Sequence, residues 1–401
     1  MREVSSIDNP NDYEISLNKE EVCIFCTTPF QVMGAISIVK SEKLTNVDLY
    51  LYNSFNGYED LANKLKKLNL FRKVVIVDFE KLMIELDLTS EHLLLIKKAT
   101  IFLMYIKNLV FLNKTVNKYL DCSANYNRIY VSTNHFAGRF AILFYIKNHR
   151  QIRVFHYDDG IGSYYGSGEL DAILPYDRLC RKVFVGKRAI NIPFVKLLFS
   201  PSFYRSVCET ANACFPQNMT RIVKMDPLEK CESNDSIIRN IFGLTTDWLI
   251  NQSFIYFDTI KAEEFNNKGI RHIQQISSLI QSCVGKDNII YKFHPRDKNI
   301  DPSLPYIKNT SVPFECFCYF NDFSNKVLIT NFSTSVFTPK ILYGQEPTIV
   351  FLYKIMADYQ IMNIDTTIVD ALRAIYSDKS KIIIPTNVEE LKTTLERLNC
   401  R

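Results

Sequence analysis

The sequence predicts an α/β protein made of two doubly wound parallel-sheet domains that face a cleft. Three observations carry this prediction. The chain has 401 residues, which at roughly 150 residues per domain allows two large domains. Its 47% hydrophobic and 23% charged residues are typical of a globular chain, and exclude a disordered or collagen-like one. Short β-branched segments alternate with helical patterns along both halves of the chain, which is typical of parallel sheets with crossover helices.

The first domain is expected to span residues 1–190. It contains six short apolar segments that we predict to be strands, each separated from the next by room for a crossover helix. These segments are Val22 to Cys26, Val47 to Tyr52, Lys73 to Val77, Arg128 to Ser132, Ile152 to Tyr157 and Lys182 to Val185.

Residues 191–250 break this alternation with four prolines and a polar run, so we expect a linking region there. The alternation resumes over residues 251–401, which we predict to be a second α/β domain. Its predicted strands are Phe254 to Phe257, Asn288 to Phe293, Val327 to Thr330, Thr348 to Leu352 and Lys381 to Ile384. For the last helix, Thr386 followed by Glu389 and Glu390 predicts an N-cap with an acidic first turn.

Charge and cysteine content restrict the partners and the compartment. The 48 lysines and arginines exceed the 43 aspartates and glutamates by only +5, so we expect no nucleic-acid partner. The excess is compatible with an anionic small substrate or an anionic lipid surface. Eleven irregularly spaced cysteines, with no apolar segment after the start, predict a reducing cytoplasm. Strand alternation would place Cys23 and Cys26 on opposite faces of a sheet, as buried structural thiols.

Ligands of parallel sheets meet the carboxyl ends of the strands, so the residues that follow each strand are the candidates for a site. Asp158, Asp159 and Gly160 follow the fifth predicted strand. Four of the chain's 12 glycines fall between Gly160 and Gly168, which indicates a tightly bent backbone. Two acids would repel a pyrophosphate, so we exclude a dinucleotide site. An acidic surface turn that caps a helix stays open as an alternative.

Three further turns lie in the second domain. Lys292, His294 and Pro295 close a strand, where cationic groups can gather around an anion. The run Ser333, Thr334 and Ser335 follows another strand, and its hydroxyls suit either a helix cap or a phosphate site. Glu315, at the expected start of a helix, is either an acid favoured by the helix dipole or an acceptor for two ribose hydroxyls.

The order of these motifs resembles that of the bacterial sialyltransferases, and most closely glycosyltransferase family 52. The resemblance rests on Asp158-Asp159-Gly160, His294-Pro295 and Ser333-Thr334-Ser335, in that order. The segment after the first strand, with Thr28 and Gln31, is also similar to the opening of that family. The likeness covers the chain from about Val22 to Leu352.

The resemblance implies a two-domain fold of the GT-B kind and inverting transfer of sialic acid from CMP-sialic acid. The acceptor would be a sugar hydroxyl, expected to be galactose, of a bacterial surface glycan such as lipooligosaccharide or capsule. Asp158 or Asp159 would be the base, with the choice between them open. His294 and the Ser333–Ser335 motif would hold the phosphate, and Glu315 the ribose. Gly160, Lys292, Pro295, Thr28 and Gln31 are further candidate substrate contacts. We expect no cofactor and no metal.

Two alternatives stay open at this point: a GT-B glycosyltransferase that uses another CMP- or UDP-sugar, and a non-catalytic nucleotide- or sugar-binding protein. Peripheral contact with the cytoplasmic membrane face is a further hypothesis, since basic and apolar side chains mix between Arg181 and Phe199. The oligomeric state is open, with a homodimer as one candidate.

Overall fold

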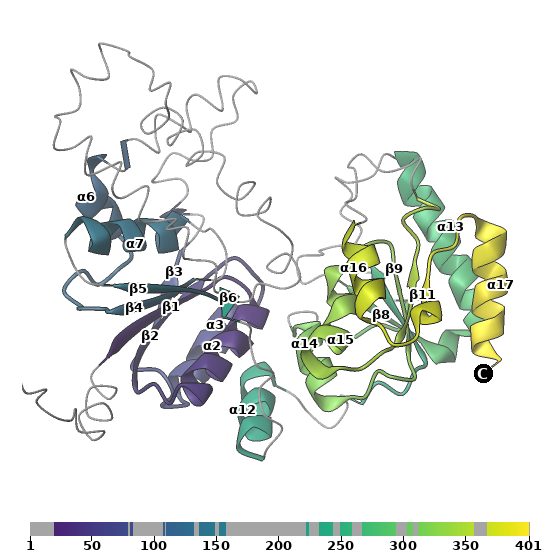
Figure 1. The fold of residues 1–401 in the computed structure, drawn as a ribbon, viewed down its shortest axis with the longest axis horizontal. Helices are drawn as coiled ribbons and strands as arrows, with labels where there is room; N and C mark the ends of the chain where they lie inside the picture. The colour runs from purple at the N-terminus through teal and green to yellow at the C-terminus, as the bar shows by residue number, and fades with distance from the viewer. Residues whose placement is uncertain are drawn as a thin grey trace, which may run out of the picture. The chain divides into compact units, whose positions relative to one another are not determined.

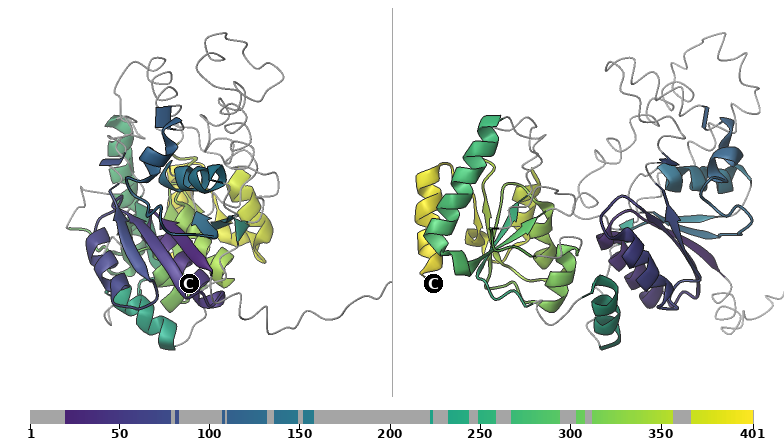
Figure 2. Two further views of the ribbon diagram at one scale, coloured as in Figure 1. Left: turned by 90° about the vertical axis from the view of Figure 1, so that its left-hand side faces the viewer. Right: turned by 180° about the vertical axis from the view of Figure 1, so that it is seen from behind.

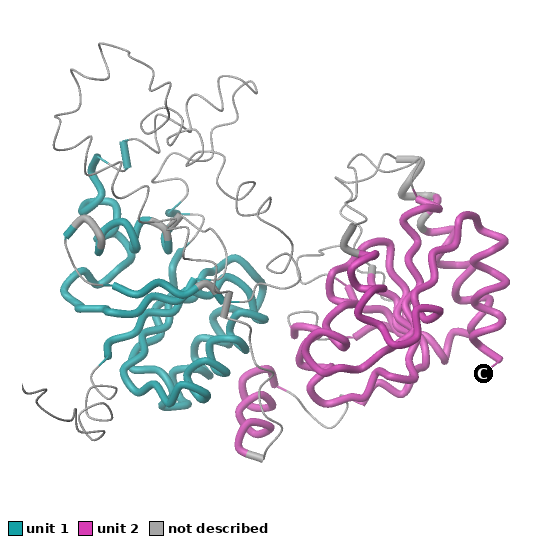
Figure 3. Tube along the Cα trace, viewed as in Figure 1, with its two compact units in different colours: residues 1–225 teal, residues 226–401 magenta. Residues whose placement is uncertain are grey.

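The structure is a computed structural model of the chain (Figure 1). It describes residues 20–78, 81–82, 107–108, 110–131, 136–148, 152–157, 222–223, 232–243, 249–258, 267–293, 303–307, 312–356 and 367–400. The chain divides into two compact units, residues 1–225 and residues 226–401 (Figure 3). Each unit has its own parallel sheet, which confirms the predicted α/β class with two doubly wound sheets.

The sheet of the first unit has six strands in the order β3-β2-β1-β4-β5-β6. Their bounds are β1 Glu21–Cys26, β2 Asn46–Tyr52, β3 Lys73–Val77, β4 Arg128–Val131, β5 Arg153–Tyr157 and β6 Ile222–Val223. All neighbouring pairs are parallel. The order reverses between β1 and β4, and ligands of open α/β sheets bind at such a reversal. The segment after β1 therefore lies where a ligand is expected.

Helices cover both faces of this sheet, with α2 and α3 on one side and α6 and α7 on the other (Figures 1 and 2). Their bounds are α2 Pro29–Ser41, α3 Tyr58–Lys66, α6 Leu112–Val116 and α7 Phe136–Lys147. Because both faces are covered, the central strands β1 and β2 are buried along almost their whole length.

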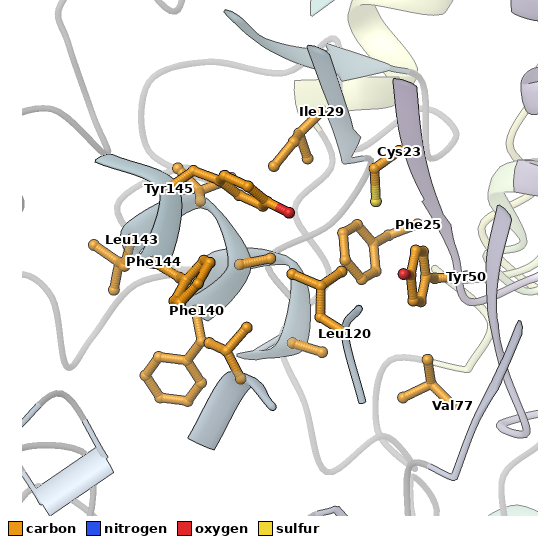
Figure 4. Close-up of a cluster of buried hydrophobic side chains, with 14 of the residues drawn as sticks. Cys23, Phe25, Tyr50, Val77, Leu120, Ile129, Phe140, Leu143, Phe144 and Tyr145 are labelled. Carbon is orange, nitrogen blue, oxygen red and sulfur yellow. The ribbon is translucent and has the colours of Figure 1, made fainter. Parts of the chain in front are cut away.

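Aromatic side chains fill the core between the sheet, α6 and α7 (Figure 4). Phe25 and Tyr50 stack there with ring centroids 5.1 Å apart. Cys23 belongs to the same cluster, whereas the Cys26 thiol donates to the backbone carbonyl of Gln31 in α2. The two cysteines thus lie on opposite faces of the sheet as free, buried thiols, which confirms the prediction from strand alternation.

The sheet of the second unit has five strands in the order β11-β10-β9-β7-β8. Their bounds are β7 Phe254–Asp258, β8 Ile289–Phe293, β9 Val327–Thr330, β10 Thr348–Phe351 and β11 Ile382–Ile383. All neighbouring pairs are again parallel. Here the order reverses between β7 and β9, so the carboxyl ends of these two strands mark the expected ligand position.

Helices also cover both faces of the second sheet. The helices of this unit are α12 Glu232–Phe242, which contacts α14, α13 Asn267–Val284, α14 Phe314–Phe320, α15 Thr338–Tyr343, α16 Thr367–Ile375 and α17 Val388–Asn399, with short 3₁₀ helices η4 Lys286–Asn288, η5 Thr334–Phe337 and η7 Lys379–Lys381. Helices α13 and α17 lie side by side on one face (Figures 1 and 2). Their buried Ile280 and Leu395 join the strands in one core. Helices α14, α15 and α16 cover the other face.

Three details differ from the sequence-based expectations or lie beyond them. The short strand β6 comes from residues 191–250, which we expected to be a linking region, and it pairs with β5. The last helix is capped by Asn387, whose side chain accepts from the backbone N–H of Glu390 at 2.9 Å. Thr386 instead donates to the Glu390 carboxylate, so its prediction as the N-cap is wrong by one residue. The strand predicted from Lys182 to Val185 lies outside the described residues.

Candidate functional site

One row of residues leads to the candidate site in the second unit. Phe257 of β7 pairs with Lys292 on β8 and with Thr330 on β9, so the three residues lie side by side near the carboxyl ends of their strands. Neighbours in such a row point to the same face of a sheet. The ring of Phe257 contacts the ring of Phe314 in α14, with centroids 4.7 Å apart. Lys292 and Thr330 therefore lie on the face that α14 covers.

The turn after β9 brings hydroxyl groups to this edge. Thr330 is fully buried, and its Oγ1 accepts from the backbone N–H of Ser333 at 2.7 Å. Ser333 is the N-cap of η5, and its Oγ accepts from the N–H of Ser335 at 3.4 Å. Thr334 is exposed, and the serines on either side of it are half-buried. The three predicted hydroxyl residues thus form one capped turn beside the reversal of strand order.

Glu315 is a buried carboxylate next to this turn. It is the second residue of α14 and is 9% exposed. Its Oε1 accepts a hydrogen bond of 3.2 Å from the hydroxyl of Thr338, the first residue of α15. The backbone N–H of Thr338 donates to the carbonyl of Ser335. Glu315 and the Ser333–Ser335 turn, 18 to 20 positions apart in the chain, are therefore joined through one residue.

Lys292 is a buried cation on the same face. Its side chain is 6% exposed, and its Nζ donates to the carbonyl of Phe293 at 3.1 Å. Both Lys292 and Glu315 act on the buried thiol of Cys316. Burial raises the pKa of that thiol well above its usual value, the negative charge of Glu315 raises it further, and Lys292 opposes this. The structure thus brings Lys292 and Glu315 within electrostatic reach of the same group.

A turn beside the strand-order reversal of the first unit, the one after β1, is organised differently. Thr28 is the N-cap of α2 and accepts from the N–H of Gln31 at 3.2 Å. The side-chain Oε1 of Gln31 accepts from the N–H and the hydroxyl of Thr27, at 2.5 and 2.9 Å. Gln31 is fully buried. Thr28 thus makes the N-cap hydrogen bond of a capping box, while the Gln31 side chain reaches back to Thr27, the residue before the N-cap.

These contacts give Thr28 and Gln31 a structural role that the sequence analysis missed. The pattern Thr-x-x-Gln before an apolar helix is a recognised mark of a helix start, so it was visible in the sequence. Substrate binding by these two residues stays a prediction.

The acidic motif and the histidine motif follow strands whose ends are well defined. Tyr157, the last residue of β5, is fully buried, and its hydroxyl donates to the carbonyl of Phe25 at 2.6 Å. The same hydroxyl lies 3.2 Å from the Cys26 thiol, whose pKa burial raises to about 12. Asp158, Asp159 and Gly160 come next in the chain, as His294 and Pro295 come after β8. All five lie outside the described residues.

The described residues contain neither a cluster suited to a metal ion nor a helix suited to span a membrane. No group of three or more histidine, cysteine, aspartate or glutamate side chains in the described ranges is placed to hold a metal ion. Among the helices that the structure describes, none combines the length and the apolar composition needed to cross a bilayer. The basic and apolar residues between Arg181 and Phe199, on which the membrane hypothesis depends, are not among the described residues.

Comparison with known proteins identifies the class. Residues 23–352 match the alpha-2,8-polysialyltransferase (POLYST) family. This match spans most of both units and includes every candidate site residue, so the chain is a glycosyltransferase of a sialyltransferase family. It belongs to the alpha-2,8-polysialyltransferase family. The predicted sialyltransferase class is thereby confirmed, while glycosyltransferase family 52 itself stays a prediction. No curated protein sequence matches the chain.

Solved structures with a similar course of the chain include two transferases and an epimerase. Arabidopsis thaliana UGT89C1 complexed with UDP is 11% identical, with a TM-score of 0.45 over 95% of this chain and 90% of that one. The spinosyn rhamnosyltransferase SpnG is 10% identical, with a TM-score of 0.41 over 95% and 90%. The UDP-GlcNAc 2-epimerase from Neisseria meningitidis, bound to UDP-GlcNAc, is 11% identical, with a TM-score of 0.37 over 95% and 94%. At these TM-scores, the three structures say nothing about the reaction of this chain.

Proposed function

We propose that the protein transfers sialic acid from CMP-sialic acid to a sugar hydroxyl, with inversion at the anomeric carbon. The observation that carries this proposal is the match of residues 23–352 to a sialyltransferase family. It is supported by the composition of the carboxyl edge of the second sheet. A buried acid, a buried cation and a hydroxyl turn gather there at the point where nucleotides bind to open α/β sheets.

The proposed roles divide between the two units. In the first, Asp158 or Asp159 takes the proton from the acceptor hydroxyl as its oxygen attacks the anomeric carbon. In the second, the bond from the sugar to CMP breaks and the leaving phosphate gains negative charge. His294 as imidazolium and the hydroxyls of Ser333 and Ser335 stabilise that charge. Fixed hydrogen-bond donors have their largest effect on charge that develops in the transition state.

Glu315 is proposed to accept hydrogen bonds from the ribose hydroxyls of the cytidine. A carboxylate can accept about four hydrogen bonds, so a bond from Thr338 does not prevent it from accepting others. Lys292 contributes positive charge on the same face of the sheet. We further propose that no divalent metal takes part, because CMP carries a single phosphate whose charge these groups can balance.

The acceptor is proposed to be the terminal sugar of a bacterial surface glycan, such as lipooligosaccharide or capsule. The resemblance seen in the sequence favours galactose. The family name favours a terminal sialic acid, since an alpha-2,8-polysialyltransferase extends a sialic acid chain. We place the reaction at the cytoplasmic face of the membrane.

One assay tests the donor and the acceptor together. The purified protein is incubated with CMP-sialic acid and a panel of acceptors that end in galactose or in sialic acid, and the products are identified by mass spectrometry. We expect one sialic acid to be added and CMP to be released. UDP-glucose and UDP-N-acetylglucosamine serve as control donors. Transfer from a UDP-sugar but not from CMP-sialic acid would contradict the proposal, and release of no nucleotide from any donor would favour a non-catalytic binding protein.

A further inference from the structure

Thr338 contacts both parts of the proposed nucleotide site. Its backbone N–H donates to the carbonyl of Ser335, in the turn assigned to the phosphate. Its hydroxyl donates to Oε1 of Glu315, the carboxylate assigned to the ribose, at 3.2 Å. Neither the sequence motifs nor the family match singles out this residue. Its place in the structure does so, because it lies at the junction of η5 and α15.

Thr338 lies between well-packed residues. Val336 and Phe337, the two residues before it, are 0% and 1% exposed, and Pro339 after it is buried in the first turn of α15. Two heavy atoms on its Cβ limit a threonine in a helix to few χ1 rotamers. The donor is therefore presented to Glu315 from a well-packed segment of the backbone.

A hydrogen bond to a buried carboxylate has two consequences. It lowers the cost of burying the charge, and it restricts the orientation in which the second oxygen is presented. For a group that must accept hydrogen bonds from the two neighbouring hydroxyls of a ribose, this orientation decides whether the contacts form. A carboxylate free to rotate would lose entropy each time it bound the sugar.

We propose that Thr338 is a positioning residue, which orients the Glu315 carboxylate toward the ribose of the bound nucleotide. This inference rests on the proposed function, since it takes Glu315 as the ribose contact. It adds a specificity determinant to that function: recognition of the ribose depends on a residue from the helix that follows the phosphate-binding turn.

The test compares two nucleotides on the full-length chain. Binding of CMP and of 2′,3′-dideoxy-CMP is measured by calorimetry on the wild type, Thr338→Val, Thr338→Ser and Glu315→Gln. Valine keeps the shape of threonine and removes the hydroxyl, and serine restores the hydroxyl. Thr338→Ala offers the same comparison should the valine variant not fold. Thr393→Val is the matched control, because it removes a hydroxyl that donates to a backbone carbonyl on the exposed face of α17.

We expect Thr338→Val to weaken CMP binding about tenfold, because a misoriented Glu315 carboxylate loses about one hydrogen bond to the ribose, and to change dideoxy-CMP binding by less than about twofold. Thr338→Ser and Thr393→Val should bind both nucleotides as the wild type does. In the Glu315→Gln background, Thr338→Val should have little further effect, because the two residues act as a unit.

Two results would overturn the inference alone. One is CMP binding by Thr338→Val equal to that of the wild type. The other is an equal loss of CMP and dideoxy-CMP binding, which would assign Thr338 to stability. If the wild type itself binds no CMP, the proposed function fails together with this inference.

Discussion

The turn after β1 and the turn after β9 both border the reversal of strand order in their sheets, yet they use their polar groups differently. Each lies where the strand order reverses, and each starts a helix with a hydroxyl N-cap. After β1, Gln31 is fully buried and its side-chain Oε1 accepts two hydrogen bonds from Thr27. After β9, Thr334 is exposed, and the buried charges of Lys292 and Glu315 lie on the adjacent face.

This difference separates a structural turn from a candidate binding turn. Position at a reversal of strand order is common to both, so position alone does not assign a site. Among the described residues, a buried cation and a buried acid, Lys292 and Glu315, lie next to the turn after β9, whereas residues 27–31 carry no charged side chain. We therefore propose that the nucleotide binds in the second unit.

The largest expected effect comes from the acidic motif of the first unit. Replacing whichever of Asp158 and Asp159 is the base by asparagine keeps its shape but removes the proton acceptor. We expect turnover to fall by about 10²–10⁴, with CMP affinity almost unchanged. Turnover, CMP affinity and melting temperature are measured on both variants. Asp60→Asn, an exposed residue of α3, is the control. Near-normal transfer by both motif variants would show that neither residue is the base.

His294→Ala should give a smaller loss, with a different signature. Removing charge from the leaving-group side should lower turnover by about 10² and also weaken CMP binding about tenfold. Steady-state kinetics and calorimetry measure the two effects. His272→Ala, on α13, controls for the loss of a histidine in the same unit. If turnover falls while CMP affinity stays at the wild-type value, His294 does not hold the phosphate.

Gln31→Ala should lower the stability of the protein and leave CMP binding unchanged. It removes the acceptor of two buried donors of Thr27, which should lower the free energy of unfolding by about 1–3 kcal/mol. Denaturant unfolding and CMP calorimetry measure the two quantities, with Gln275→Ala on the exposed side of α13 as the control. A stable variant with weakened activity would instead make Gln31 a substrate contact, as the sequence resemblance suggests.

Most of the fold could be predicted from the sequence, because buried parallel strands leave continuous β-branched runs. The run Val327 to Thr330 is the strand β9, residue for residue. Strand β6 was missed, since two residues, Ile222–Val223, carry no periodicity. The N-cap of α17 was displaced by one position, because Thr386 and Asn387 are both good capping residues and only the geometry decides between them.

The candidate site could be predicted only in part. The sequence places Glu315 at the start of a helix and Ser333–Ser335 after a strand, but does not indicate that Thr338 joins them. That contact depends on how α14 and α15 pack, which no local pattern encodes. Lys292 and Thr330 lie in one row because both pair with Phe257 of β7, which lies between β8 and β9. The order of strands is a property of the whole sheet, so no local pattern indicates this row.

The smallest expected effect is that of metal removal. With a single phosphate on the donor, balanced by His294 and the hydroxyl turn, EDTA should leave turnover unchanged within about twofold. Initial rates are measured with EDTA and again after an excess of magnesium is added. A complete loss of turnover in EDTA that magnesium restores would show that a metal ion balances the charge of the phosphate instead.

Hydrogen exchange tests the central claim, that the nucleotide is bound at the carboxyl edge of the second sheet. Amide exchange of the full-length chain is followed by mass spectrometry with and without saturating CMP, and peptides from residues 20–41 and 312–338 are compared. We expect CMP to slow exchange in 312–338, which contains Glu315 and the hydroxyl turn, and to leave 20–41 unchanged. Protection of 20–41 with no change in 312–338 would contradict the assignment.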